Sequence, residues 1–489
     1  MNITPLDVGS GENLYEAVAD RVAWLIENGT LRPGDRIPSV RRMHEQLEVS
    51  ISTVMQAYRL LEDRGLVEAR PQSGYYVRRG ADRRPDEPTV ARPASSPRKV
   101  CVCSLSYSLM DKLDHAGVVK LGAAVPDVEL MPVKALNRCF GQVLRYNTAN
   151  AHGYDTPAGC DELRSEIARR MLDAGVTVSA DEIVTTCGTT EGLYLALRAV
   201  TKPGDTVAIE TPTYYGVLEK LEELQLRSLE LRTDPRDGPD VDSLAEAVSA
   251  GKVQALLTVS NFSNPLGSCI PDDRKRAIMG IMSRAGLPVI EDDIFGELYF
   301  EGTRPKTLKA YDQEGLVLYC SSFSKTLSPG SRAGWCIPGR FAERFLRTKM
   351  AVSPVCPMVT QLAIAAYLKQ GGFDRHLRRL RRCYRDQVNR VAQAVGRHFP
   401  EGTRVSNPAG GYVLWVEMPD GVDSLKLHDE AAEHGISIAP GPLFSPVGSY
   451  RNCLRLNCGI QWSPRVEAAV AMVGTLARKQ LAMAAGGGT

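Results

Sequence analysis

The sequence lacks the features of an exported or membrane-spanning protein. Its first residues, MNITPLDVGS, contain no apolar segment behind a basic one, as a signal peptide would. No apolar run approaches the roughly 18 residues that a membrane-spanning helix needs. We therefore expect a cytoplasmic protein with no membrane partner.

The twelve cysteines lack the regular spacing of a metal site or a disulfide framework. The chain contains no CxxC pair, and no cluster of histidines lies near any cysteine. We predict free thiols and no metal site.

The chain also lacks a strong net charge. Its 59 basic and 57 acidic residues leave a formal charge of +2, so no overall basic field indicates nucleic acid and none excludes it. The length of 489 residues predicts two to four folding units, at roughly 100–200 residues each.

A segment poor in large apolar residues separates two parts of the chain. Residues 81–100, ADRRPDEPTVARPASSPRKV, contain five basic residues, three acidic residues and four prolines. This composition buries too little apolar surface to offset the entropy of ordering. We predict a flexible linker over residues 81–115, between a domain at residues 1–80 and a body at residues 116–489.

The first eighty residues predict a helix-turn-helix and a hairpin. Apolar residues recur at helical spacing over 12–28. A short helix is expected over 40–47, and Ser50 or Ser52 can cap a second helix after a tight turn, which is the helix-turn-helix motif. Residues 66–77 predict a hairpin wing, so the domain is expected to be a winged helix-turn-helix of the α+β class.

Charge leaves a second interpretation of this domain open. Residues 1–80 hold ten basic and eleven acidic residues, whereas DNA-binding modules are usually basic. A packing module without a DNA role would fit that balance. Five arginines in the segments that would face DNA favour DNA binding: Arg41, Arg42, Arg70, Arg78 and Arg79.

The core GTLRPGDRIPSVR, at residues 29–41, resembles the winged-helix domain of GntR-type bacterial regulators. The similarity covers about residues 12–78. It implies the following DNA-binding residues: Arg41 for a phosphate, Ser50, Ser52 and Thr53 for bases, and Gly74 for the minor groove. Ile51 departs from the arginine common at its position in that family, so the operator sequence of relatives cannot be transferred.

After the linker, strand-like and helix-like segments alternate. Short apolar runs such as TVAIE at 206–210 and LVLYC at 316–320 end in polar turns, with helical patterns between them. This alternation predicts an α/β fold with a mostly parallel sheet covered by helices. We expect a large subdomain over about 155–350 and a smaller α+β subdomain over about 351–480. Its basic helix, Arg378–Arg385, is interpreted as a solvated face, with DNA phosphate contacts as the alternative.

Several polar groups follow the predicted strands of the body. Lys325 lies in SSFSKTLSPGSRAGW, and a lysine that forms Schiff bases needs a neighbouring cation or a dry pocket to lower its pKa. The turn before a helix at Thr189 and Thr190 can bind phosphate. Tyr214 offers an aromatic ring, and Asp292 ends an apolar strand, where a carboxylate is costly unless it is paired.

Together these segments resemble fold-type I aminotransferases, which use pyridoxal 5'-phosphate (PLP). The similarity covers about residues 118–475 and includes these motifs: YDTPAG at 154–159, NPLG at 264–267, SFSKTLSPGSRAG at 322–334 and APGPLF at 439–444.

The resemblance implies a role for each matching residue. Lys325 forms the Schiff base, and Asp292 pairs with the pyridine nitrogen. Tyr214 stacks on the ring, and Asn264 donates to its phenolic oxygen. Four residues hold the phosphate: Thr189, Thr190, Ser322 and Arg332. Tyr154 reaches the phosphate in the partner subunit of a homodimer, and Arg455 binds the carboxylate of an amino acid.

One position departs from the aminotransferase pattern. Relatives place a tyrosine two or three residues after the acid, where this chain has Ile294 and Phe295. Neither can donate to the phenolic oxygen, so we predict that the Schiff base holds its proton more tightly. Tyr299 could compensate in a different register.

The combination resembles the MocR subfamily of GntR-type regulators. It implies a head-to-tail homodimer that binds a double-stranded DNA operator and PLP, and that responds to an amino acid, an amine or PLP itself. A working aminotransferase with an accessory DNA-binding domain remains the alternative, as does a sensor of PLP alone. The sequence does not identify the effector, the operator or the sign of regulation.

Overall fold

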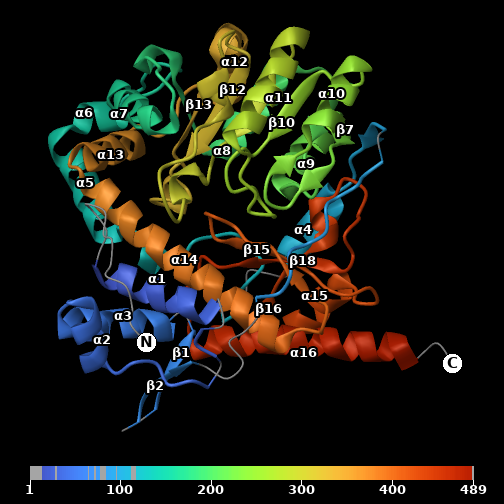
Figure 1. The fold of residues 1–489 in the computed structure, drawn as a ribbon. Coiled ribbons are helices and arrows are strands. Elements are labelled where there is room, and N and C mark those ends of the chain that lie inside the picture. Colours follow the sequence, from blue (N-terminus) through green and yellow to red (C-terminus); the bar gives the residue numbers. More distant parts are fainter. Residues whose placement is uncertain are drawn as a thin grey trace. The chain divides into compact units, whose positions relative to one another are not determined.

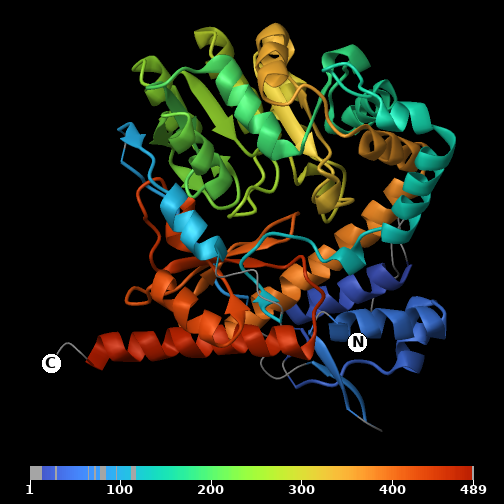
Figure 2. The same cartoon turned by 180° about the vertical axis from the view of Figure 1, so that it is seen from behind.

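The computed structural model describes residues 14–27, 30–32, 34–63, 65–70, 73–77, 84–94, 96–111 and 117–486; Figure 1 shows the fold and Figure 2 the same chain from behind. The chain divides into two compact units. Unit 1 is Met1–Pro85 with Asn389–Arg397, and unit 2 is Asp86–Val388 with His398–Thr489. Among the described helices, none has both the length and the apolarity needed to cross a lipid bilayer.

Unit 1 begins with three helices followed by a hairpin. Its elements are α1 (Leu14–Glu27), α2 (Val40–Leu47), α3 (Ile51–Asp63), β1 (Val67–Arg70) and β2 (Gly74–Val77). The strands pair antiparallel with Arg70 opposite Gly74. This order of elements confirms the winged helix-turn-helix.

Local sequence explains the turn between α2 and α3. Ser39 caps α2 by accepting the Arg42 N–H, and Glu48 ends it in the left-handed region at φ 54°. Ser50 Oγ then accepts the Thr53 N–H at 3.1 Å, which starts α3. The side chains of Val54 and Tyr58 are fully buried at the i and i+4 positions of α3, and each contributes about 1.5–3 kcal/mol by leaving water.

Unit 2 is built on an eight-stranded sheet of order β3-β7-β6-β10-β11-β12-β13-β5. Its strands are β3 (Arg98–Lys99), β5 (Val184–Thr186), β6 (Thr206–Ile209), β7 (Arg227–Glu230), β10 (Ala255–Thr258), β11 (Val289–Asp292), β12 (Val317–Ser322) and β13 (Gly334–Ile337). The five strands from β7 to β12 in this order are parallel, whereas β13 is antiparallel to both neighbours. The predicted α/β class with a mostly parallel sheet is confirmed.

Unit 2 also contains the following helices: α4 (Cys103–Asp111), α5 (Val133–Tyr146), α6 (Thr148–His152), α7 (Asp161–Met171), α8 (Thr189–Val200), α9 (Tyr215–Glu223), α10 (Val241–Ser249), α11 (Asp272–Ala285), α12 (Ala342–Val352) and α13 (Met358–Lys369). Of these, α8, α9, α10, α11 and α12 lie along the sheet in Figure 1. The inner strands β6, β10 and β11 are buried at every position, so both faces of the sheet select apolar side chains. Polar residues begin where these strands end.

The C-terminal part of unit 2 carries a smaller antiparallel sheet of order β14-β15-β18-β17. Its strands are β14 (Arg404–Val405), β15 (Val413–Glu417), β17 (Ala439–Pro440) and β18 (Cys453–Asn457). Helices α14 (Gly372–His398), α15 (Ser424–Glu433) and α16 (Pro464–Gly486) belong to the same stretch of chain. Two further pairs of short strands lie outside these sheets: β4 (Val119–Lys120) pairs with β16 (Ile436–Ser437), and β8 (Thr233–Asp234) pairs with β9 (Gly238–Pro239).

The segment predicted as a flexible linker is bound to unit 2 over most of its described length. Glu87 pairs with Arg236 at 2.6 Å, and the Thr89 N–H donates to Glu417 at 2.8 Å. Strand β3 pairs with β7, and the Val102 N–H donates to Glu222 Oε2 at 2.6 Å. Ion pairs and backbone hydrogen bonds act together with the buried side chains of Val100 and Val102, which belong to the core of unit 2. The bonding partners of the segment lie far away in the sequence, so the composition of the segment does not reveal them.

The basic part of α14 makes bonds within unit 2. Arg381 Nε donates to the Glu297 carbonyl oxygen and its Nη1 to the Tyr299 hydroxyl, both at 2.7 Å. Arg379 Nη2 donates to the Leu130 carbonyl oxygen at 2.7 Å. These bonds run to residues outside the smaller subdomain. The predicted solvated face therefore fits Arg378 and Arg382, which are exposed, but not Arg381, whose side chain is mostly buried.

Candidate cofactor-binding site

A cavity of about 240 Å³ lies at the carboxyl ends of the parallel strands of unit 2. Such an edge is where open α/β sheets bind ligands. Eight residues singled out in the sequence line it: Thr189, Thr190, Tyr214, Asn264, Asp292, Ser322, Lys325 and Arg332. They come from segments that span more than a hundred residues, and the fold brings them to one place.

One end of the cavity is formed by the start of α8. Gly188 precedes the helix at φ 81° and provides no side-chain cap, so the first N–H groups of α8 stay available. The Thr189 hydroxyl is buried with no hydrogen-bond partner in the described structure. A Cβ on Gly188 would lie 2.4 Å from Arg332 Nη2, so only glycine allows that guanidinium to approach. Free N–H groups, a hydroxyl and a cation together form an anion site.

Asp292 is the buried carboxyl group of the cavity. It ends β11, and its Oδ1 accepts the Ile294 N–H at 3.1 Å. Burial raises the pKa of Asp292 to about 7, and the cations of Lys220 and Lys325 partly oppose that rise. In the part of the chain that the structure describes, Asp292 has no ion-pair partner within 4 Å. A cationic ligand would therefore stabilise its ionised form.

Lys325 follows β12 and directs its Nζ to the Ala124 carbonyl oxygen at 2.7 Å. Burial, followed by the nearby Arg455 and Arg332 cations, lowers the pKa of Lys325 to about 8, although Asp292 opposes the change. A lysine with this pKa has a substantial neutral fraction near pH 7, which a nucleophilic amine requires.

Arg455 lies beside the cavity in β18. It is fully buried, and its Nη1 donates to Asn264 Oδ1 at 3.0 Å, while Nη2 donates to the Gly122 carbonyl oxygen. Its Nε is buried and makes no hydrogen bond in the described structure. The guanidinium also lies 5.1 Å from the centre of the Phe444 ring. A buried arginine with a free N–H favours a carboxylate ligand.

One feature of the site differs from the aminotransferase pattern, in which a tyrosine follows the acid. Ile294 and Phe295 both line the cavity and offer no hydroxyl. Tyr299 does not compensate, because it does not line the cavity; its hydroxyl instead accepts a hydrogen bond from Arg381. The absence of a donor at this position, noted in the sequence, is therefore a property of the folded site.

Sequence reasoning missed Lys220. This lysine is buried in α9, lines the cavity and donates to the Gly216 carbonyl oxygen at 2.7 Å. Burial lowers its pKa. A signal was present, because Lys220 interrupts the apolar face that Val217 and Leu221 form at helical spacing.

Tyr154 does not line the cavity of its own chain. Its side chain is 95% exposed. It is thus available for a second copy of the chain, and its predicted role across a subunit interface stays a prediction.

The residues of unit 1 that are predicted to read DNA bases lie at the start of α3. The hydroxyls of Ser50, Ser52 and Thr53 bond to one another, with Ser50 Oγ at 2.8 Å from Ser52 Oγ and 2.7 Å from Thr53 Oγ1. Ile51 is half exposed beside them. Arg41 at the start of α2 is exposed, as is Gly74 of the wing. Arg70 bonds to Glu68 instead of remaining free, and Arg78 and Arg79 lie outside the described residues.

Comparison with known proteins finds a matching family for each of the two parts of the chain. The family of aminotransferases of class I and II matches residues 116–467, and the gntR family of bacterial regulatory proteins matches residues 14–77. An HTH-type transcriptional regulator of Escherichia coli, YjiR, is 38% identical over 94% of this chain and 98% of its own length.

The chain belongs to the GntR-type transcriptional regulators that carry an aminotransferase domain, the MocR-like architecture.

Solved aminotransferases show the fold of unit 2 of this MocR-like regulator. The multiple substrate aminotransferase of Thermococcus profundus has a TM-score of 0.73 at 25% identity, covering 78% of this chain and 96% of that one. An α-aminoadipate aminotransferase of Thermus thermophilus, complexed with N-(5'-phosphopyridoxyl)-L-leucine, has a TM-score of 0.71 at 27% identity, covering 77% and 98%.

Proposed function

We propose that this MocR-like regulator binds PLP at Lys325 and adjusts its binding to a DNA operator in response to an amino acid, an amine or PLP. One observation carries the proposal. The residues that an aminotransferase uses for its cofactor line a single cavity in a chain that also has a GntR-type DNA-binding domain.

The cavity fits PLP in three respects. The start of α8, the partnerless Thr189 hydroxyl and Arg332 suit a phosphate. The buried Asp292 carboxyl suits a pyridinium nitrogen, since a cation there offsets the cost of its burial. Lys325 supplies an amine of lowered pKa for the aldehyde. When bound, PLP would supply an aldehyde carbon that exchanges one amine for another and an electron-withdrawing ring.

The residues around Lys325 also fit an amino acid as the effector. Arg455 provides a buried guanidinium with one free N–H, and Asn264 holds it in place. A carboxylate is the ligand that such a group binds best, and a sulfonate shares that geometry. An effector amine that competes with Lys325 for the aldehyde would release the lysine side chain, and Arg455 would orient that effector.

A homodimer is part of the proposal. Tyr154 is almost fully exposed on its own chain, and the sequence resemblance assigns it to the phosphate of a partner. We infer a head-to-tail dimer in which two DNA-binding units contact an operator with two half-sites. The effector can shift this dimer between states only by its differential affinity for them.

Two assays on the full chain test the proposal together. The purified protein, incubated with PLP, should gain a bound-cofactor absorbance band that Lys325→Ala lacks. Screening amino compounds against that band should identify the effector by a shift in its position. Binding to DNA from the region upstream of the coding sequence should then change when PLP and the effector are added. A chain that stays colourless with PLP would contradict the proposal.

A working aminotransferase is the second candidate, and the completeness of the site favours it. Lys325, Asp292, Arg455 and the phosphate-binding residues are all present, and the solved relatives of unit 2 are aminotransferases. Incubation with an amino acid and a keto acid distinguishes the two. Rapid multiple turnover supports the enzyme, whereas a single slow turnover supports the regulator.

A further inference from the structure

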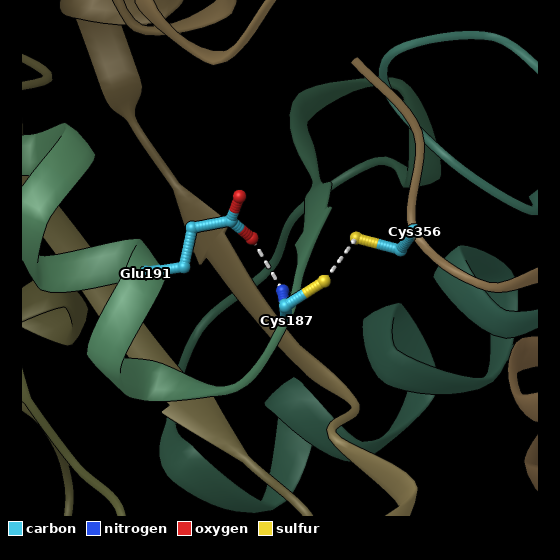
Figure 3. A group of neighbouring side chains, drawn as sticks. All are labelled: Cys187, Glu191 and Cys356. Atoms are coloured by element: carbon cyan, nitrogen blue, oxygen red, sulfur yellow. Dashed lines mark hydrogen bonds between the residues drawn. The ribbon is translucent and has the colours of Figure 1, made fainter. Parts of the chain in front are cut away.

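A second cluster of reactive side chains lies next to the phosphate end of the cavity. Figure 3 shows the Cys187 thiol directed toward the Cys356 thiol and the Glu191 carboxylate directed toward the backbone nitrogen of Cys187. Cys187 precedes α8, Glu191 belongs to its first turn, and Cys356 lies in the connection between α12 and α13. Their ligand atoms all lie within 4.8 Å of one another. The cofactor proposed above uses none of these side chains.

The spacing of the two thiols suits a tetrahedral metal ion. Cys187 Sγ and Cys356 Sγ are 3.8 Å apart. Zinc–sulfur bonds of about 2.3 Å at a tetrahedral angle place two sulfur ligands about 3.8 Å apart. A disulfide would instead require the sulfurs to approach to about 2.05 Å. The pair is therefore spaced for a bridging metal without movement.

Glu191 is held in position for a third bond. Its Oε2 accepts the Cys187 N–H and its Oε1 accepts the Ser353 hydroxyl, as Figure 3 shows for the first of these bonds. Each carboxylate oxygen keeps a second lone pair, so these bonds orient the group and leave it able to bind metal. Such supporting bonds are typical around metal ligands.

The charge around the cluster also balances with a divalent ion. Two thiolates and one carboxylate carry −3, so a bound Zn²⁺ leaves −1. Lys349 is fully buried nearby, with its Nζ donating to the Ser353 and Pro354 carbonyl oxygens at 2.8 and 3.1 Å. Its cation offsets the remaining charge.

We propose that Cys187, Glu191 and Cys356 form a zinc site with one open position. Binding would form two Zn–S bonds and one Zn–O bond, and the two thiol protons would pass to solvent. Cys187 and Glu191 line a second, open cavity of about 690 Å³, which shares Thr190, Lys220 and Arg332 with the cofactor cavity. A water molecule from this cavity would supply the fourth ligand. The sequence prediction of no metal site rested on regular cysteine spacing, which a site assembled from residues 187 and 356 does not have.

The site would act on the phosphate end of the cofactor cavity. The Cys187 carbonyl oxygen accepts a hydrogen bond from Arg332 Nη2 at 2.9 Å, and Gly188 follows directly. Zinc would join this turn to the connection between α12 and α13 and fix it in the conformation that the anion site requires. Zinc loading should therefore strengthen the retention of PLP.

Zinc content of the full chain tests the proposal. Protein purified under reducing conditions, stripped with a chelator and equilibrated with Zn²⁺ should bind one ion per chain, measured by elemental analysis and by competition with a chromophoric chelator. Cys187→Ser and Cys356→Ser should each weaken binding by roughly tenfold or more, and Glu191→Gln by a smaller factor. Cys101→Ser, at an exposed thiol, is the matched control and should bind as the native chain does.

Any of the following results would contradict the proposed zinc site. No zinc retained by the native chain, or equal zinc in the native chain and in both cysteine variants, would contradict it. A Cys187–Cys356 disulfide in place of zinc, detected by mass spectrometry, would also contradict it. If Cys187→Ser fails to fold, Cys356→Ser and Glu191→Gln decide the question.

Discussion

The rate at which Lys325 forms its covalent bond with PLP should depend on pH, because burial lowers the pKa of this lysine. The neutral amine is the nucleophile, so the rate of capture follows the neutral fraction. Because the pKa of Lys325 is lowered from 10.5 to about 8, that fraction reaches one half near pH 8 and levels off about one pH unit higher. An exposed lysine would continue to gain reactivity toward pH 10.

The size of the effect follows from the two pKa values. At pH 7 a lysine of pKa about 8 is neutral in about one molecule in ten, whereas a lysine of pKa 10.5 is neutral in about one in three thousand. Burial of Lys325 therefore increases its reactive fraction at pH 7 by about 300-fold. Desolvation is the main cause, and the Arg455 cation adds to it.

Stopped-flow absorbance from pH 6 to pH 10 measures this dependence on the cofactor-free protein. Two variants test its cause in opposite directions. Arg455→Met removes a cation that lowers the Lys325 pKa, so the midpoint should move to higher pH. Asp292→Asn removes an anion that raises this pKa, so the midpoint should move to lower pH. The midpoint is compared, because both changes also affect cofactor affinity.

A midpoint near pH 10 in the native protein would refute the reasoning, since it would mean that Lys325 is solvated. Shifts of both variants in the same direction would refute the electrostatic part and leave desolvation alone. A capture rate that keeps rising from pH 6 to pH 10 without a plateau would likewise mean that Lys325 is solvated.

Three further predictions concern other parts of the chain. Arg304 forms a buried ion pair with Asp293 at 2.8 Å, so Arg304→Met should lower the free energy of unfolding by about 3–5 kcal/mol in urea titrations, and a loss below about 1 kcal/mol would contradict this. Ile51 is half exposed at the start of α3, so we expect it to contact a thymine methyl group. Replacing that thymine by uracil should weaken operator binding about fourfold for the native chain and leave binding by Ile51→Ala unaffected. If every uracil substitution in the operator affects the native chain and Ile51→Ala equally, the contact is ruled out. Ile294→Tyr should restore a donor near the phenolic oxygen and move the titration of the bound-cofactor absorbance to lower pH; an unchanged titration would show that the missing tyrosine has no effect.

The sequence was most informative where a motif places several residues within a few positions. The segment from Ser322 to Gly334 predicted the strand end, Lys325 and Arg332 together, and all of them lie at the cavity or at its edge. The caps and apolar spacing around α2 and α3 likewise predicted the helix-turn-helix. Local hydrogen bonds and burial decide these features, and both can be inferred from neighbouring residues.

Features that depend on distant partners could not be predicted in the same way. Residues 81–100 have the composition of a linker, but Glu87 and Thr89 within them bind Arg236 and Glu417. Cys187 and Cys356 are 169 residues apart, so their contact is invisible in the sequence. In both cases the fold supplies the neighbour, and no local pattern encodes it.

The central claim is that the imine-forming site at Lys325 controls DNA binding by the other unit. Fluorescence anisotropy with labelled upstream DNA measures it most directly, comparing the native chain and Lys325→Ala, each with and without PLP and the effector found by absorbance. We predict that the ligands change the dissociation constant of the native chain and leave that of Lys325→Ala unchanged. An identical response in both proteins, or no response in the native chain, would contradict the account.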